Sequence, residues 1–285
     1  MNERHLPPKS SPWVPLGIAA CFLVMIGVVA YLWLQPSRLP EPPPPQPVPD
    51  AVAPAPVVEP PAEPASVAIE HPLEVPASSP KPVAAPDIGS ALAELLGRKA
   101  VDSLLQTDNF TNKFVATVDN LGRARAPTMM WPANRTPGRF SVEQGPSGTV
   151  IGAANAARYA PFVQMIEKMD SARAVDLYVR MYPQFQQAYE QLGLRGYFND
   201  RLVAVIDQLL ATPDAEAAQQ VQLPEVKGPV PSVQPWVRYE FVDPKLESLT
   251  SGQKIMLRMG PANEAKLKAK LSELRGEILK RTKKR

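Results

Sequence analysis

The stretch SARAVDLYVRMYPQFQQAYEQLG, residues 171–193, decides the fold class of this chain. Its large apolar side chains recur at steps of three and four residues, at Tyr178, Tyr182, Phe185, Tyr189 and Leu192. This spacing places them on one face of a helix. Gly193 predicts the end of that helix, because glycine adopts the left-handed backbone of a C-terminal cap at no steric cost. Pro183 lacks a backbone N–H, so we expect it to bend or split the helix.

Residues 88–285 predict one large domain, because helical periodicity continues along them. Further helices are expected at 90–105, at 108–121 with Thr107 or Asp108 as the cap, and at 153–169, 199–211, 251–259 and 263–281. Strands are expected at 139–142, at 149–151 and at 235–242, where Val237, Tyr239 and Phe241 alternate with Arg238 and Glu240. The predicted fold class is mainly α with a minor β part.

Residues 14–34 predict a single transmembrane helix, because this apolar stretch carries no charged residue. About 20 residues, at ~1.5 Å of rise each, cross the ~30 Å hydrocarbon layer of a bilayer. Trp13 lies at one end of the stretch, and Tyr31 and Trp33 lie at the other. Amphipathic rings favour the two membrane interfaces, so the lipid bilayer is the expected partner of residues 14–34.

The flanking charges predict the orientation of this helix. Arg4 and Lys9 precede it, whereas Arg38 alone follows it closely. Because basic residues stay on the cytoplasmic side, residues 1–13 are expected to form a cytoplasmic tail. The expected location is the inner membrane, with a single pass and the C-terminal domain in the periplasm.

Residues 35–87 are a Pro/Ala-rich linker by composition. The chain has 35 prolines in 285 residues, about 12% against a usual ~5%, and they gather in this stretch. Proline fixes φ and donates no amide hydrogen, so runs such as 42–45 favour extended polyproline II. We expect a disordered spacer that lets a terminal domain at 88–285 act at a distance from the membrane.

The inventory of reactive residues excludes most hydrolase and zinc sites from the predicted domain. The only cysteine, Cys21, and the only histidines, His5 and His71, all precede residue 88. Without them the domain cannot form a Ser-His-Asp or Cys-His nucleophile, nor a thiolate or imidazole zinc site. We therefore assign no catalytic residue, no metal site and no cofactor.

Three kinds of chemistry survive that exclusion: a serine with a lysine, paired carboxylates, and a hard cation bound by carboxylates. Ser251 and Lys254 have the S-x-x-K spacing of a serine activated by a lysine, but Thr250 and Gln253 also fit a capping box at the same place. Several carboxylates could supply the acid and base that cleave a glycan, namely Asp119, Glu167, Asp170, Asp176, Glu190, Asp200 and Glu247. In a helical domain such acids are more often solvated or paired with arginine.

Two groups of residues are candidate binding residues. The first group joins aromatic side chains to an Asn-Asp-Arg sequence at a predicted helix start and comprises Tyr197, Phe198, Asn199, Asp200 and Arg201. The alternative is that Asn199 or Asp200 caps the helix while Tyr197 packs at its start. The second group, Arg135 and Arg139, lies in an irregular stretch and could receive an anionic polymer.

Four sequence blocks carry a resemblance to a known family. They are FVATVDNL at 114–121, YPQFQQAY at 182–189, GYFNDRLV at 196–203, and GQK at 252–254 followed by LRMG at 257–260. Together they resemble an uncharacterised proteobacterial family of single-pass envelope proteins, domain of unknown function 3014. The resemblance covers nearly all of residues 88–280. It implies a location and an architecture, and no activity for any residue.

These observations favour a non-enzymatic envelope protein anchored in the inner membrane. We expect its periplasmic domain, held on the long Pro-rich spacer, to bind or scaffold another envelope component, either a periplasmic protein or peptidoglycan. The alternative is a peptidoglycan-active enzyme that uses carboxylates. No nucleic-acid partner is expected, because the predicted orientation places the basic tail at 280–285 outside the cytoplasm, where a membrane or wall contact fits better.

Overall fold

The computed structural model describes residues 68–74, 83–225 and 234–282. The chain divides into two units, Met1–Glu63 and Pro64–Arg285, and all described residues belong to the second unit. The predicted tail at 1–13, the predicted transmembrane helix at 14–34 and most of the predicted linker lie outside the described residues. Among the residues that are described, no helix combines the length and the apolar character that a membrane crossing requires.

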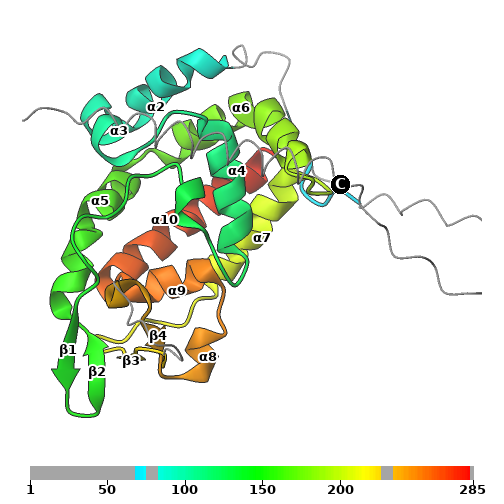
Figure 1. The fold of residues 1–285 in the computed structure, drawn as a ribbon. Coiled ribbons are helices and arrows are strands. Elements are labelled where there is room, and N and C mark those ends of the chain that lie inside the picture. The colour runs from blue at the N-terminus through cyan, green and yellow to red at the C-terminus, as the bar shows by residue number, and fades with distance from the viewer. Residues whose placement is uncertain (1–67, 75–82, 226–233, 283–285) are drawn as a thin grey trace, which may run out of the picture. The chain divides into compact units, whose positions relative to one another are not determined.

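The second unit is mainly helical with a small β part, as the sequence predicts (Figure 1). Its α-helices are α2 (Ile88–Leu96), α3 (Arg98–Leu104), α4 (Phe110–Leu121), α5 (Ala160–Lys168), α6 (Ser171–Gln191), α7 (Phe198–Leu210), α8 (Pro244–Glu247), α9 (Ser251–Arg258) and α10 (Pro261–Lys280). Short 3₁₀ helices are η1 (Ala85–Asp87), η2 (Thr128–Met130), η3 (Ala153–Arg158) and η4 (Pro235–Val237). The strands are β1 (Val142–Gly145), β2 (Gly148–Ile151), β3 (Val221–Gln222) and β4 (Glu240–Phe241).

Helix α6 supplies the centre of the core and packs against α4, α7 and α10. The rings of Phe185 and Phe114 are 4.9 Å apart, and those of Phe185 and Phe198 are 5.9 Å apart. The predicted stripe is therefore confirmed except at Leu192, which is 43% exposed. Pro183 lies on the exposed side, and α6 continues through it, so the expectation of a split helix is wrong.

The predicted end of α6 at Gly193 is confirmed. Gly193 has a φ of +74°, and the N–H of Leu194 donates to the carbonyl of Tyr189 at 3.2 Å. This bond reaches back five residues, which is the arrangement of a Schellman cap.

Two predicted helices are each interrupted in the structure. The stretch 90–105 is divided into α2 and α3 at Gly97. Its φ of +86° is incompatible with the interior of an α-helix. The stretch 153–169 begins with the 3₁₀ helix η3, and α5 begins only at Ala160. Neither Thr107 nor Asp108 caps α4, because the capping position falls on Asn109, which has a φ of +53°.

The β part is a hairpin joined to two very short strands. Strands β1 and β2 pair in antiparallel register, with Val142 opposite Ile151, and a bridge from Val150 to Gln220 continues the pairing toward β3. β3 pairs with β4, and the inner side chains of the strands, Ile151, Val221 and Phe241, form a second small core with Leu257 of α9.

The strand predicted at 235–242 is largely wrong. Its first residues form η4, and only Glu240–Phe241 pair with another strand. Val237, expected on the buried face, is 68% exposed. Pro235 favours the turn because its fixed φ suits the first position of a helix.

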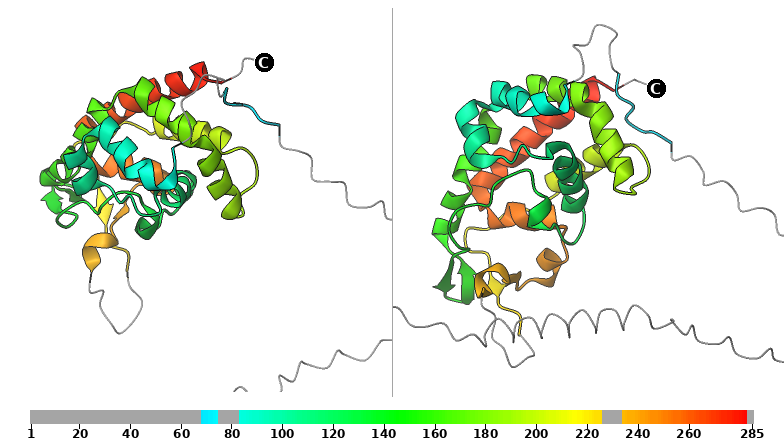
Figure 2. Two further views of the ribbon diagram at one scale, coloured as in Figure 1. Left: turned by 90° about the horizontal axis from the view of Figure 1, so that it is seen from above. Right: turned by 45° about the horizontal axis from the view of Figure 1, so that its top comes forward.

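The packed unit begins before residue 88, inside the predicted linker. Leu73 and Val83 are buried in the main core together with Ile88 and Leu92. The side-chain amide of Gln184 on α6 donates to the carbonyl of Val83. Figure 2 shows residues 68–74 beside the C-terminal end of α10, where the N–H of Glu74 donates to the carbonyl of Arg281 at 2.8 Å.

Candidate functional site

The N-terminal turn of α7 holds a short, bent piece of the chain's own N-terminal part, residues 69–74, which we call the docked segment. Asp200 lies in that turn and accepts two successive backbone N–H groups of the segment. Its Oδ2 atom is 3.0 Å from the nitrogen of Glu70, and its Oδ1 atom is 2.7 Å from that of His71. Both oxygens of this carboxylate are thus used to bind main chain.

Asn199 and Tyr197 extend this recognition along the segment. The side-chain amide of Asn199 donates to the carbonyl of His71 at 2.8 Å. The hydroxyl of Tyr197 accepts from the N–H of Leu73 at 3.2 Å. Leu73 itself is only 8% exposed and is the apolar anchor of the segment. The site therefore binds the backbone of the docked segment together with one apolar side chain, that of Leu73.

Hydroxyl and amide groups behind these residues hold them in place. The Asn199 Oδ1 atom accepts from the Tyr178 hydroxyl at 3.0 Å, and Asn199 is fully buried. The Tyr182 hydroxyl donates to Gln186 Oε1 at 2.9 Å, and the same oxygen accepts from the N–H of Phe198 at 2.8 Å. Burial raises the pKa of both Tyr178 and Tyr182, so both hydroxyls remain neutral donors.

The docked segment also reaches α10. Leu73 pairs with Thr282 in a bridge, and Glu74 bonds to Arg281 as described above. Arg281 is held by Asp176 on α6 at 2.7 Å and by Glu277 at 2.8 Å. One short segment thus ties the start of α7 to the end of α10.

His71 corrects the expectation that no histidine belongs to the folded part. Its Nδ1 atom is 3.2 Å from Asp200 Oδ1. Because both Asp200 oxygens already bind backbone N–H groups, the pair fits a structural role better than proton transfer to a substrate. Among the described residues, no group of acids and histidines could hold a metal ion.

The five candidate residues at 197–201 are engaged within the unit. Tyr197 occupies the capping position of α7, and neither Asn199 nor Asp200 caps the helix, so that alternative is wrong. Tyr197 does pack at the helix start, with its ring 5.1 Å from that of Tyr182. Phe198 is fully buried. Arg201 turns away from the docked segment and contacts α4.

Arg201 joins α7 to α4 through Asp119. Its Nε atom is 3.0 Å from Asp119 Oδ1, and its Nη2 atom is 2.8 Å from the Asp119 carbonyl. Arg123 holds the other carboxylate oxygen at 2.7 Å. Gly122 leaves room for this arrangement, because a Cβ there would lie 2.8 Å from Arg201 Nη2.

Arg135 and Arg139 lie in the loop before β1 and are separate from the docked segment. Both side chains are exposed. The guanidinium of Arg139 stacks 3.9 Å above the ring of Trp236, a cation–π contact that ties this loop to η4. The two candidate groups therefore form no single site.

The candidate catalytic groups have structural partners. The capping box at Thr250 and Gln253 is present. The Ser251 hydroxyl donates to the carbonyl of Asn120 at 2.8 Å, and Lys254 is 2.7 Å from Glu247. The other carboxylates are engaged as well: Glu167 with Lys266, Asp176 with Arg281, Glu190 with Gln186, and Asp170 with the N–H of Arg173.

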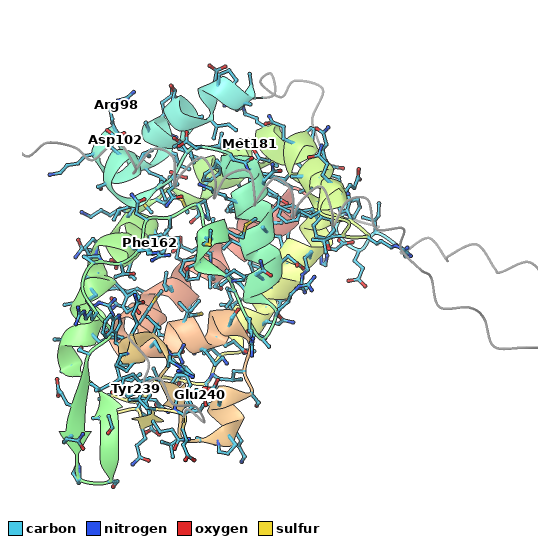
Figure 3. The ribbon with its side chains drawn as sticks, in the orientation of Figure 1. Arg98, Asp102, Phe162, Met181, Tyr239 and Glu240 are labelled. Atoms are coloured by element: carbon cyan, nitrogen blue, oxygen red, sulfur yellow. The ribbon has the colours of Figure 1, made fainter. Side chains whose placement is uncertain are left out.

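A cleft of about 360 Å³ opens at the β end of the unit. Its lining carries no charged side chain and comprises Ser147, Gly148, Thr149, Gln220, Val221, Gln222, Leu223, Tyr239 and Val242. Figure 3 shows Tyr239 and Glu240 at the end of the unit opposite Arg98 and Asp102. Leu223 and Val242 add exposed apolar surface to the rim.

The comparisons with known proteins give a family and no activity. Neither the curated proteins nor the solved structures contain a match. The family described as Protein of unknown function (DUF3014) matches residues 110–275, which include all four blocks quoted above. This match spans more than half of the 285 residues. The chain therefore belongs to the DUF3014 family.

Proposed function

We propose that this chain is a non-enzymatic, membrane-anchored envelope protein whose folded domain, carried on the Pro-rich spacer, binds or scaffolds another envelope component. The anchor is the predicted helix at 14–34, and the charges before it favour a periplasmic domain. The partner fits either a periplasmic protein or the peptidoglycan.

The docked segment is the observation that supports this role. The spacer runs directly into residues 69–74, and these are bound by Asp200, Asn199 and Tyr197 and by the end of α10. A force applied through the spacer therefore acts first on α7 and α10, two long helices of the core, and only then on η1 and α2. Such an attachment suits a domain that must hold its position while tied to a membrane.

The carboxylates support binding over catalysis. A glycan-cleaving pair needs one acid that can donate a proton and one carboxylate free to act as base or nucleophile. Glu247 instead accepts from the N–H of Phe241 at 2.9 Å and pairs with Lys254, and Asp119 is held between Arg123 and Arg201. These contacts hold elements of the fold together.

A topology measurement tests the location. Alkaline phosphatase fused after Arg285 is active only outside the cytoplasm, so the full chain should give active fusions and a chain without residues 14–34 should not. An inactive fusion on the full chain would contradict the periplasmic location.

A second measurement separates scaffold from enzyme. The purified full chain is incubated with peptidoglycan, and soluble fragments and sedimented protein are both measured. We expect no release of fragments. Release that is abolished by Glu247→Gln, but not by Glu225→Gln as the matched acidic control, would establish the enzyme instead.

A further inference from the structure

We propose that the groove on α7 also accepts the docked segment of a second copy, so that two chains assemble by exchanging residues 69–74. This goes beyond the proposed function and does not depend on where in the cell the domain lies. By groove we mean the residues that contact the docked segment, Tyr197, Asn199 and Asp200 together with the end of α10.

The chemistry of the groove suits an exchangeable ligand. Its polar contacts go to the N–H groups of Glu70, His71 and Leu73 and to one carbonyl, and such backbone groups are present in any copy of the segment. Selectivity rests on the buried Leu73 and on the pairing of His71 with Asp200. An occupant must therefore bend as residues 70–71 do and carry a leucine two residues after a histidine, and the chain itself supplies that sequence.

The docked segment is attached to the unit as a separate piece. It is part of no helix or named strand, and its partners on α7 lie 124 to 130 residues further along the chain. Residues 75–82 connect it to Val83, and eight residues can reach on the order of 28 Å when extended. A segment whose hydrogen bonds to α7 and α10 reach so far along the chain, joined by such a connection, is the type that copies exchange in domain swapping.

Concentration decides between the two arrangements, because the contacts are the same in both. A short connection gives the segment a local concentration of about millimolar in its own chain. We therefore expect isolated chains to be monomeric when dilute and to exchange segments when crowded, as they would be when tethered to one surface. The other possible occupant, a peptide from a different protein, would make no such dimer.

The test mixes two defective full-length chains in detergent, carrying donor and acceptor fluorescent proteins at the C-terminus. Leu73→Asp removes the apolar anchor of the segment and leaves the groove intact. Asp200→Ala removes two hydrogen bonds of the groove and leaves the segment intact. Only the mixture contains one good groove and one good segment. We expect energy transfer in the mixture to exceed that of either variant alone by roughly tenfold at equal concentration.

Controls keep this result interpretable. The double variant Leu73→Asp/Asp200→Ala replaces Asp200→Ala in the mixture as the control and should give no rise, because no chain then carries an intact segment. If a variant loses its helical circular dichroism, the milder pair Leu73→Ala and Asn199→Ala takes its place. A photoreactive residue at Ile69 in the otherwise unchanged chain gives an independent readout, because exchange produces cross-linked dimers that Asp200→Ala removes.

Two outcomes would overturn the proposal. The first is a mixture no more associated than its components up to millimolar concentration, with Ile69 cross-links confined to single chains. The second is a chain that stays monomeric while the groove of Leu73→Asp binds a synthetic peptide of residues 67–76, which would make the groove a receptor for other peptides.

Discussion

Replacing Gly252 with alanine should separate α9 from α4 and destabilise the unit. Gly252 lies in the first turn of α9, directly against the last turn of α4. An added Cβ would lie 2.6 Å from Leu209 Cδ2, 3.0 Å from the carbonyl oxygen of Leu121 and 3.2 Å from Leu121 Cβ. The leucine side chain at 209 can rotate, but the carbonyl belongs to the backbone of α4. The two helices must therefore move apart.

The expected cost follows from overpacking. Inserting one methyl group into a well-packed interior typically costs about 1–3 kcal/mol. Alanine favours a helix over glycine by ~0.5–1 kcal/mol, which offsets part of that cost. We therefore expect a net loss of about 1–2 kcal/mol in the free energy of unfolding, or roughly 2–8 °C in melting temperature for a unit of this size. Urea and thermal unfolding followed by far-ultraviolet circular dichroism measure both quantities.

Gly276→Ala is the matched control, because Gly276 lies within α10 and a Cβ there would meet nothing within 4 Å. It keeps the gain in helix propensity and adds no contact, so it should stabilise the unit by ~0.5–1 kcal/mol. If Gly252→Ala were as stable as Gly276→Ala, the close approach of α9 to α4 would be wrong, and with it the placement of the capping box.

Three further substitutions test the contacts that position the site. Asp119→Asn leaves Arg201 and Arg123 without their charged acceptor. It should lower the free energy of unfolding, measured in urea, by about 2 kcal/mol. An unchanged midpoint of the urea transition would contradict the link between α4 and α7. Thr250→Ala removes the N-cap of α9 and should cost about 1 kcal/mol, while Thr250→Ser should restore most of it in the same assay. Hydrogen bonds from Lys280 and then Arg281 lower the pKa of Glu277 from its ordinary value of 4.5. Because its folded-state pKa is depressed, its contribution is present above about pH 4.5 and is lost as the pH falls further. Melting temperatures measured down to about pH 3 should fall less steeply in Glu277→Gln, and an identical decline would refute the pairing.

Local periodicity predicts the helices well because their buried faces repeat within one element. The stripe on α6 is visible as Tyr178, Tyr182, Phe185 and Tyr189, and three of these rings contact Phe114, Phe198 or Tyr197 as neighbours in the core. The hydrophobic pattern does not reveal the break at Gly97, because leucines continue at helical spacing on both sides of it. Only the glycine itself marks the position, and glycine is also tolerated inside helices.

The prediction of a strand at 235–242 is wrong for a different reason. Alternation over so few residues cannot distinguish a strand from a turn followed by a single bridge. In the structure Trp236 is held under Arg139, a residue almost a hundred positions earlier, and Val237 is left exposed. The competing contact is tertiary, so the local pattern contains no trace of it.

The docked segment does leave a signal in the sequence. Residues 67–75, VAIEHPLEV, contain a single proline and several branched apolar side chains within a stretch otherwise dense in proline. That change of composition could have placed an ordered element there. The sequence does single out Tyr197, Asn199 and Asp200 as candidate binding residues, but it could not show what they bind, because the segment that they hold lies some 130 residues earlier.

The four family blocks meet in the interior, and this limits what they can say about function. Phe114 from the first block contacts Phe185 and Phe198 from the second and third, and Ser251, at the start of α9 beside the fourth block, bonds to Asn120 in the first. The residue types in these blocks are thus required by packing between α4, α6, α7 and α9. A change in one of them alters stability before it alters recognition. The third block is the exception, because its Tyr197, Asn199 and Asp200 also bind the docked segment. Outside the blocks, the exposed rim of the cleft at Leu223 and Val242 offers apolar surface that the core does not use.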